Sequence, residues 1–198
     1  MSTWVVVLIK DFGSAKQRLR PALGPKERRA LAQRNAQLAV EAAEAGDRIL
    51  VVAGDDEVAE LARGWGAEVL LEPTQEGQNA AAARGIARAV DGGADAVLLL
   101  SSDLPLVTIE SVREVLEAGA RIEGRRAAVA VRAVGRGGTN ALYLRPPDAI
   151  TLHFGSDSLA KFRKEAEISG VNFVVHDSDA MALDLDEPGD LARLRSAV

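Results

Sequence analysis

The segment Thr3–Ile9, with the sequence TWVVVLI, is a continuous and largely β-branched apolar run. Such a run is typical of a strand that is buried on both faces of a parallel sheet. A polar stretch follows at residues 10–24, and Pro25 stands where a helix can begin. The apolar spacing after Pro25 predicts a helix up to Gly46. That helix would return the chain to a second parallel strand, Arg48–Ala53.

The same unit of strand and helix recurs after this second strand. Apolar runs and helical spacings predict helices over residues 55–63, 77–90 and 109–118, and strands over residues 67–71 and 96–100. Consecutive units of this kind imply right-handed crossovers and a doubly wound sheet.

The pattern changes after residue 126. Strands are expected over residues 127–134 and 141–144, and the linking segment 135–140 is too short for a crossover helix, so the two strands form a hairpin and make the sheet mixed. The remaining expected elements are a helix over Ser158–Ile168, a strand over 171–175, a short apolar run over 181–185 and a terminal helix after Pro188. The sequence therefore predicts an α/β fold of three layers, with a doubly wound, mixed but mostly parallel sheet, in one domain over residues 1–198.

The composition excludes several classes of protein. Lys and Arg number 24 against 29 Asp and Glu, and the net charge of −5 argues against a nucleic-acid partner. Without cysteine, the 198-residue chain has no disulfide, thiolate nucleophile or cysteine metal site. Oxygen ligands and a hard ion such as Mg²⁺ are therefore expected at any metal site. No basic leader precedes an apolar run and no membrane-length apolar run occurs, so we expect a soluble, cytoplasmic protein without a membrane partner.

Ligands of open α/β sheets bind beyond the carboxyl ends of the strands, which selects candidate segments by position. The segments at such positions are residues 10–20, 54–56, 101–104 and 184–187.

The first of these segments is a basic loop. This loop contains Gly13 and Ser14 together with the basic residues Lys10, Lys16, Arg18 and Arg20. The combination suits a polyphosphate by charge and by exposed backbone N–H groups. Lys10 and Arg18 are the favoured phosphate ligands, and a solvated basic loop is the alternative. The phosphate-binding pattern GxxxxGK[ST] is absent, which disfavours an ordinary P-loop.

Carboxylates follow two later apolar segments. Asp103 leaves the most apolar strand, where it either holds a cation that bridges phosphates or caps a turn. In the segment LDLD, strand alternation would place Asp184 and Asp186 on one face, about 6–7 Å apart, close enough to ligate one metal ion. Asp186 is equally suited to cap a helix that begins at Pro188.

Two further segments suit a smaller anion. The glycine-rich segment 135–140 offers backbone amides and the Thr139 hydroxyl, although a plain turn is the simpler interpretation. Gly155 and Ser158 stand at the start of an expected helix, where free N–H groups and hydroxyls suit a phosphate or carboxylate. Asp157 opposes an anion at that place and is itself a candidate helix cap.

Three isolated polar residues complete the candidates. Asn79, near the start of an alanine-rich helix, is a candidate contact to a nucleotide base or ribose. His153 and His176 have no catalytic partner at a suitable spacing, and we expect both to be structural or surface residues.

Seven motifs occur in one order along nearly the whole chain. They are IKDFGSAKQRL (residues 9–19), LGPKERRALA (23–32), GQNAA (77–81), SSDLPL (101–106), GGTNALYLRPP (137–147), FGSDSL (154–159) and ALDLDEPGDL (182–191). Together they resemble the guanylyltransferases that activate 2-phospho-L-lactate or phosphoenolpyruvate in coenzyme F-420 biosynthesis. The fifth and seventh motifs, in that order after SSDLPL, are the most specific.

The resemblance implies a nucleotidyltransferase with a glycosyltransferase-A-like fold, which uses GTP, Mg²⁺ and a small phosphorylated carboxylic acid. The implied site residues are Lys10, Lys16 and Arg18 at the triphosphate, Asp103, Asp184 and Asp186 at the metal, and Thr139, Gly155 and Ser158 at the phospho-acid. Arg136 and the pair Ser101 and Ser102 depart from the family pattern, which leaves the enzyme class intact but bears on the choice of acid.

The implied chemistry agrees with the residues present. The acceptor phosphate is already anionic at neutral pH, so attack on the α-phosphorus needs alignment and charge neutralisation rather than a general base. One alternative is a nucleotidyltransferase with a molybdopterin or sugar-phosphate acceptor, but those relatives usually carry a glycine-rich LAGGxSxRxG-like loop, and residues 7–11 read VLIKD. Another is a non-catalytic nucleotide-binding protein, which retention of every carboxylate disfavours. The sequence is compatible with a monomer and with a homodimer.

Overall fold

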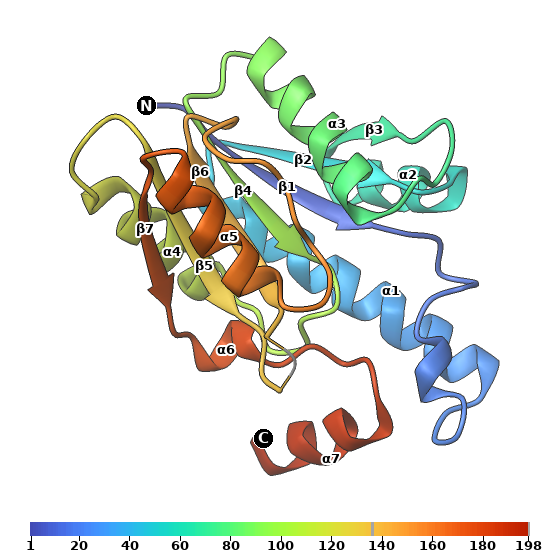
Figure 1. Cartoon of the computed structure of the whole chain (residues 1–198). Helices are drawn as coiled ribbons and strands as arrows, with labels where there is room; N and C mark the ends of the chain where they lie inside the picture. Colours follow the sequence, from blue (N-terminus) through green and yellow to red (C-terminus); the bar gives the residue numbers. More distant parts are fainter. Residues whose placement is uncertain (136, 198) are drawn as a thin grey trace.

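A seven-stranded sheet lies between two layers of helices in the computed structural model of the chain, which describes residues 1–135 and 137–197 (Figure 1). The strand order is β3-β2-β1-β4-β6-β5-β7. The strands are β1 (Thr3–Ile9), β2 (Arg48–Ala53), β3 (Glu68–Leu71), β4 (Ala96–Ser101), β5 (Ala127–Arg132), β6 (Thr139–Arg145) and β7 (Asn172–His176).

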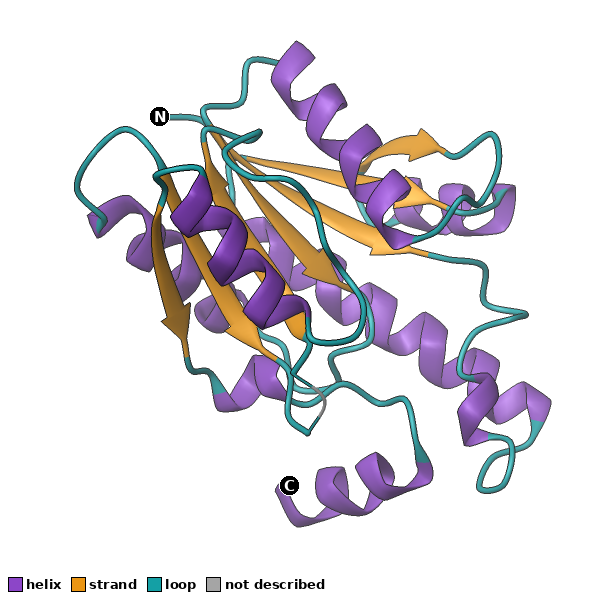
Figure 2. Ribbon diagram, viewed as in Figure 1, coloured by secondary structure: helices purple, strands orange, loops and turns teal. Residues whose placement is uncertain are grey.

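Helices cover both faces of the sheet (Figure 2). Apolar residues of α1, α2 and α4 pack in one core cluster, and those of α3 and α5 pack in the other. The helices are α1 (Pro25–Ala42), α2 (Asp56–Gly64), α3 (Gln78–Asp91), α4 (Ile109–Arg121), α5 (Ser158–Ile168), α6 (Asp179–Ala182) and α7 (Pro188–Ala197), with short 3₁₀ helices η1 (Gln17–Leu19) and η2 (Ala43–Ala45). None of the described helices is both long and apolar enough to cross a membrane.

Strand β1 lies at the centre of this arrangement. It pairs in parallel with β2 on one side and β4 on the other. Val5 and Val7 contribute to one core cluster, while Trp4 and Val6 contribute to the other. Because successive side chains of a strand point to opposite faces, a strand covered on both faces must be apolar throughout. The predicted doubly buried strand is confirmed.

The predicted hairpin is also confirmed, with shifted ends. Strand β6 runs antiparallel to β4 and β5, and β7 is parallel to β5, so the sheet is mixed and mostly parallel. The second strand begins at Thr139, not at residue 141 as predicted, because Thr139 pairs with Arg132 across a β-bulge. Thr139 and Asn140 are therefore buried strand residues and not part of an exposed loop.

The short run over residues 181–185 does not form the strand that the alternation suggested. Met181 lies in α6, Leu183 is extended, and residues 183–186 belong to no strand of the sheet. Their backbone bonds instead to loops, since Leu185 N–H donates to Asp103 O at 3.2 Å and Val134 N–H donates to Ala182 O at 2.9 Å. Alternation nevertheless persists, with Leu183 and Leu185 buried.

Gly119 lets helix α4 approach the sheet closely. A Cβ atom at this position would lie 2.3 Å from the ring of Tyr143 on β6. We predict that Gly119→Ala destabilises the protein by about 1–3 kcal/mol, because the rigid ring and α4 must separate. Thermal unfolding should show a melting temperature lowered by roughly 2–4 °C for each kcal/mol.

The matched control is Gly64→Ala in α2, where a Cβ atom would meet nothing within 4 Å. This variant should be as stable as the wild type or more stable, because alanine reduces the conformational entropy of the unfolded chain. Equal melting temperatures for the two variants would contradict the close packing of α4 on β6.

Candidate active site

A cleft of about 800 Å³ opens beyond the carboxyl ends of β1 and β4. Its walls come from the loop after β1, the segment from β3 into α3, the loop after β4, the β5–β6 hairpin, the loop before α5 and the segment before α7. The predicted site residues that line it are Lys10, Lys16, Arg18, Asp103, Thr139, Gly155, Ser158, Asp184 and Asp186. The predicted segment 54–56 does not line the cleft, and Asp55 caps α2 through Val58 N–H instead.

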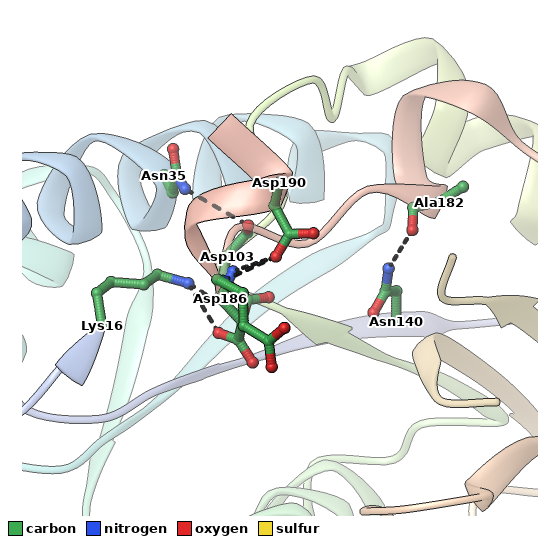
Figure 3. Close-up of polar contacts among 8 residues, drawn as sticks. Lys16, Asn35, Asp103, Asn140, Ala182, Asp186 and Asp190 are labelled. Carbon is green, nitrogen blue, oxygen red and sulfur yellow. Dashed lines mark hydrogen bonds and ion pairs between the residues drawn. The ribbon is translucent and has the colours of Figure 1, made fainter. Parts of the chain in front are cut away.

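Three carboxylates of the cleft lining lie close together. Oxygen atoms of Asp103, Asp184 and Asp186 all lie within 4.8 Å of one another. Oxygen donors at this spacing are compatible with a divalent cation such as Mg²⁺, Mn²⁺ or Ca²⁺. Helix α1 helps to place the group, because the amide of Asn35 donates to Asp103 O at 3.4 Å (Figure 3).

Lys16 lies against this acidic group. Its Nζ is 3.2 Å from Asp103 Oδ2 and 3.5 Å from Asp186 Oδ1, and the side chain is only 6% exposed (Figure 3). The backbone of Lys16 is left-handed, with φ of 57°, which directs the chain into η1. The cluster of carboxylates therefore already attracts a cation. A metal ion bound at these residues would compete with the ammonium group for the same oxygen atoms.

The segment that carries Asp184 and Asp186 is anchored at both ends. The buried amide of Asn140 on β6 donates to Met181 O at 2.8 Å and to Ala182 O at 3.1 Å (Figure 3). At the other end, Asp190 Oδ2 accepts from the N–H groups of Asp186, at 3.0 Å, and of the next residue. Backbone anchors thus hold the two carboxylates without depending on a bound ion.

The start of α7 shows that Asp186 is not the helix cap, contrary to the alternative interpretation of this residue. The helix begins at Pro188, so its cap position is Glu187 and not Asp186. Asp190, three residues into the helix, accepts from Glu187 N–H at 2.8 Å, which is one half of a capping box. Position at the end of a strand, which predicted the carboxylates, does not predict Asn140 or Asp190. The sequence does offer a signal for each, because Asn140 follows Thr139 and Asp190 lies three residues after the cap position.

The basic loop presents two cations at the surface of the cleft. Lys10 is exposed, and Arg18 is exposed while it lies 3.7 Å from Glu187 Oε1. Asp11 shapes the loop by accepting hydrogen bonds from both Ser14 N–H and the Ser14 hydroxyl. Burial alone would raise the pKa of Asp11, but the hydrogen bonds from Ser14, Gln75 and Gly13 outweigh it, and the pKa is lowered. Asp11 thus stays ionised and keeps the loop folded.

The hydroxyl-bearing residues meet at another wall of the cleft. Ser158 Oγ donates to Thr139 Oγ1 at 3.0 Å, and both side chains are buried. Gly155, with φ of 122°, adopts a backbone conformation that glycine allows readily. Asp157 occupies the predicted cap position of α5, but its side chain makes no capping hydrogen bond. Arg136 lies outside the described residues.

The remaining candidates lie away from the cleft lining. Asn79 bonds to the backbone of Phe154, donating to its carbonyl at 3.1 Å and accepting from its N–H at 2.8 Å. His153 lies 3.4 Å from Glu165, and His176 lies 3.9 Å from a glutamate of α4. Neither histidine lines the cleft.

A further wall holds residues that the sequence patterns do not single out. Glu72, directly after β3, lines the cleft with a side chain only 5% exposed, and it forms an ion pair with Arg84 at 2.8 Å. Gln75 also lines the cleft and donates to Gly54 O at 3.0 Å. Their shared position after a strand of the sheet is the signal that could have found them.

Sequence relatives cover almost the whole chain. The family model "Guanylyl transferase CofC like" matches residues 3–195. The chain is 39% identical to a phosphoenolpyruvate guanylyltransferase of Rubrobacter xylanophilus, with 100% of this chain and 95% of that protein covered. It is 32% identical to a 2-phospho-L-lactate guanylyltransferase of Methanothermobacter thermautotrophicus (98% and 84% covered). It is also 32% identical to a 3-phospho-D-glycerate guanylyltransferase of Phenylobacterium zucineum (93% and 86% covered).

Solved structures share the fold. A nucleotidyl transferase of Methanothermobacter thermautotrophicus superposes with a TM-score of 0.68 at 19% identity, covering 99% of this chain and 97% of the other. The manganese complex of Rv0371c from Mycobacterium tuberculosis gives 0.62 at 18% identity, with both chains fully covered at 100%. The predicted nucleotidyltransferase fold of the glycosyltransferase-A-like type is confirmed, as is the resemblance drawn from the seven motifs. The protein belongs to the family of CofC-like guanylyl transferases.

Proposed function

We propose that the protein transfers GMP from GTP to the phosphate of a small 2-phospho acid, either 2-phospho-L-lactate or phosphoenolpyruvate, and releases pyrophosphate in coenzyme F-420 biosynthesis. The observation that carries this proposal is the set of groups that line one cleft. These groups are three clustered aspartates, a loop with two exposed cations and a wall with two paired hydroxyls. Such a cleft offers groups suited to a metal ion, a triphosphate and a smaller anion.

Asp103, Asp184 and Asp186 are the residues that would hold Mg²⁺. A bound magnesium ion supplies neutralisation of phosphate charge. Around it, Lys10 and Arg18 would bind the triphosphate and stabilise the charge on the departing pyrophosphate. Lys16, which contacts two of the three aspartates, would also contact the phosphates of GTP next to the metal site.

Thr139, Gly155 and Ser158 would bind the phospho-acid. In the reaction, an oxygen of the acceptor phosphate forms a bond to the α-phosphorus of GTP, and the bond from that phosphorus to the pyrophosphate oxygen breaks. The acceptor phosphate loses its second proton near pH 6, so no side chain has to remove a proton from it. This agrees with the place of both histidines outside the cleft lining.

Three phospho-acids are named among the relatives. Relatives named for three different acids share 32–39% identity with this chain. A molybdopterin or sugar-phosphate acceptor fits less well, because the loop after β1 is basic rather than glycine-rich. Because the proposed reaction uses GTP, we infer a cytoplasmic protein, as a monomer or a homodimer. The net charge of −5 argues against a nucleic-acid partner.

Pyrophosphate release tests the proposed reaction. We expect release from GTP with magnesium and either 2-phospho-L-lactate or phosphoenolpyruvate, each supplied separately. Release with 3-phospho-D-glycerate alone would overturn the proposed acceptor. The other nucleoside triphosphates serve as controls for the base. Mass spectrometry of the product should show GMP joined to the acid. Silence with every acid, from protein that melts cooperatively, would contradict the proposal.

The variant Asp103→Asn tests the role of the acidic group. We predict a loss of turnover of at least roughly 10²-fold, because the cation site loses a charge where phosphate charge must be neutralised. Titration with Mn²⁺ followed by electron paramagnetic resonance should show weaker binding, while the melting temperature stays near that of the wild type.

The control is Asp91→Asn, which changes an exposed aspartate at the end of α3, outside the cleft lining. It should keep both turnover and Mn²⁺ binding. An Asp103→Asn protein with turnover and metal affinity like those of the control would exclude Asp103 as a metal ligand.

A further inference from the structure

Asn79 joins two segments that are 75 residues apart in the chain. Its Nδ2 donates to Phe154 O at 3.1 Å, and its Oδ1 accepts from Phe154 N–H at 2.8 Å. Asn79 is an exposed residue in the first turn of α3. At this exposed position, water could hydrogen-bond both the side chain and the Phe154 backbone. The two hydrogen bonds that form instead make Asn79 a specific clamp between the two segments.

The clamp lies at a junction in the wall of the cleft. On the α3 side, Gly77 and Gln78 line the cleft, and on the other side Phe154 and Gly155 line it. Asn79 itself does not line the cleft, yet it ties these two walls together. In Figure 1, the loop that leads into α5 passes beside the first turn of α3. The distance between the two walls therefore depends on this side chain.

The loop before α5 needs such support because its backbone is unusual. Gly155 and Asp157 both have positive φ, of 122° and 55°, and the left-handed conformation is costly for a residue with a side chain. The far end of the loop is fixed to the β5–β6 hairpin, where Ser158 Oγ donates to Thr139 and Leu159 N–H donates to Gly137 O at 3.1 Å. Among the described residues, Asn79 makes the backbone hydrogen bonds of Phe154 at the near end.

We propose that Asn79 is a positioning residue that holds the loop of residues 154–158 in the conformation that binds the acceptor acid. This inference rests on the proposed assignment of Gly155 and Ser158 to the acceptor. Through the clamp, the wall formed by α3 sets the position of Gly155, while Thr139 sets that of Ser158. Asn79 acts through the loop and does not contact the reacting atoms.

The chemistry of the clamp calls for an amide. Asparagine supplies one donor and one acceptor on adjacent atoms, which match the C=O and N–H of Phe154. Aspartate keeps the acceptor for Phe154 N–H but places a negative oxygen against Phe154 O. Alanine removes both partners, yet leaves the exposed first turn of α3 able to form. Both variants should therefore disturb the clamp, the first by repulsion and the second by loss of both hydrogen bonds.

Steady-state kinetics of Asn79→Ala and Asn79→Asp test the proposal. We expect the KM for the acceptor acid to rise roughly tenfold in the alanine variant, which loses both hydrogen bonds. The rise should be at least as large in the aspartate variant, which keeps one bond but sets a carboxylate oxygen against Phe154 O. The KM for GTP should change by less than about twofold. A rise in the KM for GTP with an unchanged KM for the acid would overturn the proposal and make Asn79 a nucleotide contact.

Amide hydrogen exchange gives a second readout that does not depend on turnover. Backbone amides of residues 152–157 should exchange faster in Asn79→Ala, while those of β1 and β4 keep the protection of the wild type. Unchanged exchange in that loop would overturn the clamp, whatever the kinetics. If the wild type itself transfers no GMP, the proposed function fails, and the exchange experiment still decides whether Asn79 holds the loop.

The matched control is Asn172→Ala. Asn172 is an exposed asparagine of β7 whose Nδ2 donates to Glu123 O at 2.9 Å, outside the cleft lining. The substitution removes a similar hydrogen bond at β7, an edge strand of the sheet. Both KM values and the exchange of residues 152–157 should match those of the wild type. An equal rise of the acceptor KM in this control would show a general loss of stability and would overturn the specific role of Asn79.

Discussion

Mutual repulsion of three carboxylates is the constraint on which the cleft depends. Oxygen atoms of Asp103, Asp184 and Asp186 lie within 4.8 Å of one another. At about 4 Å, two like charges repel by roughly 1 kcal/mol in water and by several times more near a protein surface. The ammonium group of Lys16 offsets part of this repulsion. The rest is resisted by backbone anchors, so the acidic group stays assembled at the edge of the sheet.

Those anchors come from distant parts of the chain. Asn140 on β6 holds the carbonyl groups at the end of α6, Asn35 on α1 holds Asp103 O, and Asp190 holds the start of α7. Each is a buried polar side chain that is satisfied by backbone groups. Lys16 adds a left-handed residue, a conformation that costs energy and persists where the surrounding structure determines it. The clustered carboxylates, the capped start of α7 and the left-handed Lys16 therefore lie in one region. Phosphate transfer needs charged groups that are fixed in place in this way.

Much of the site follows from where apolar runs end. Because β1 and β4 are buried on both faces, polar residues directly after them must lie at one edge of the sheet, and this reasoning finds Lys10 and Asp103. The segment over residues 181–185 shows the limit of the same logic. Its alternation is real, but the carbonyl of Ala182 bonds to Val134 and Asn140 rather than to a neighbouring strand. Periodicity reports which side chains are buried and not which backbone partner is present.

The sequence by itself determined the order of strands and helices, the mixed sheet and most of the residues that line the cleft, because burial patterns and strand ends are local properties of the chain. The tertiary structure alone decided which distant groups meet. Lys16 lies against Asp103, Glu72 lines the far wall, and Asn79 holds Phe154. These contacts depend on how strands far apart in the chain are placed side by side, and no short-range spacing encodes that placement.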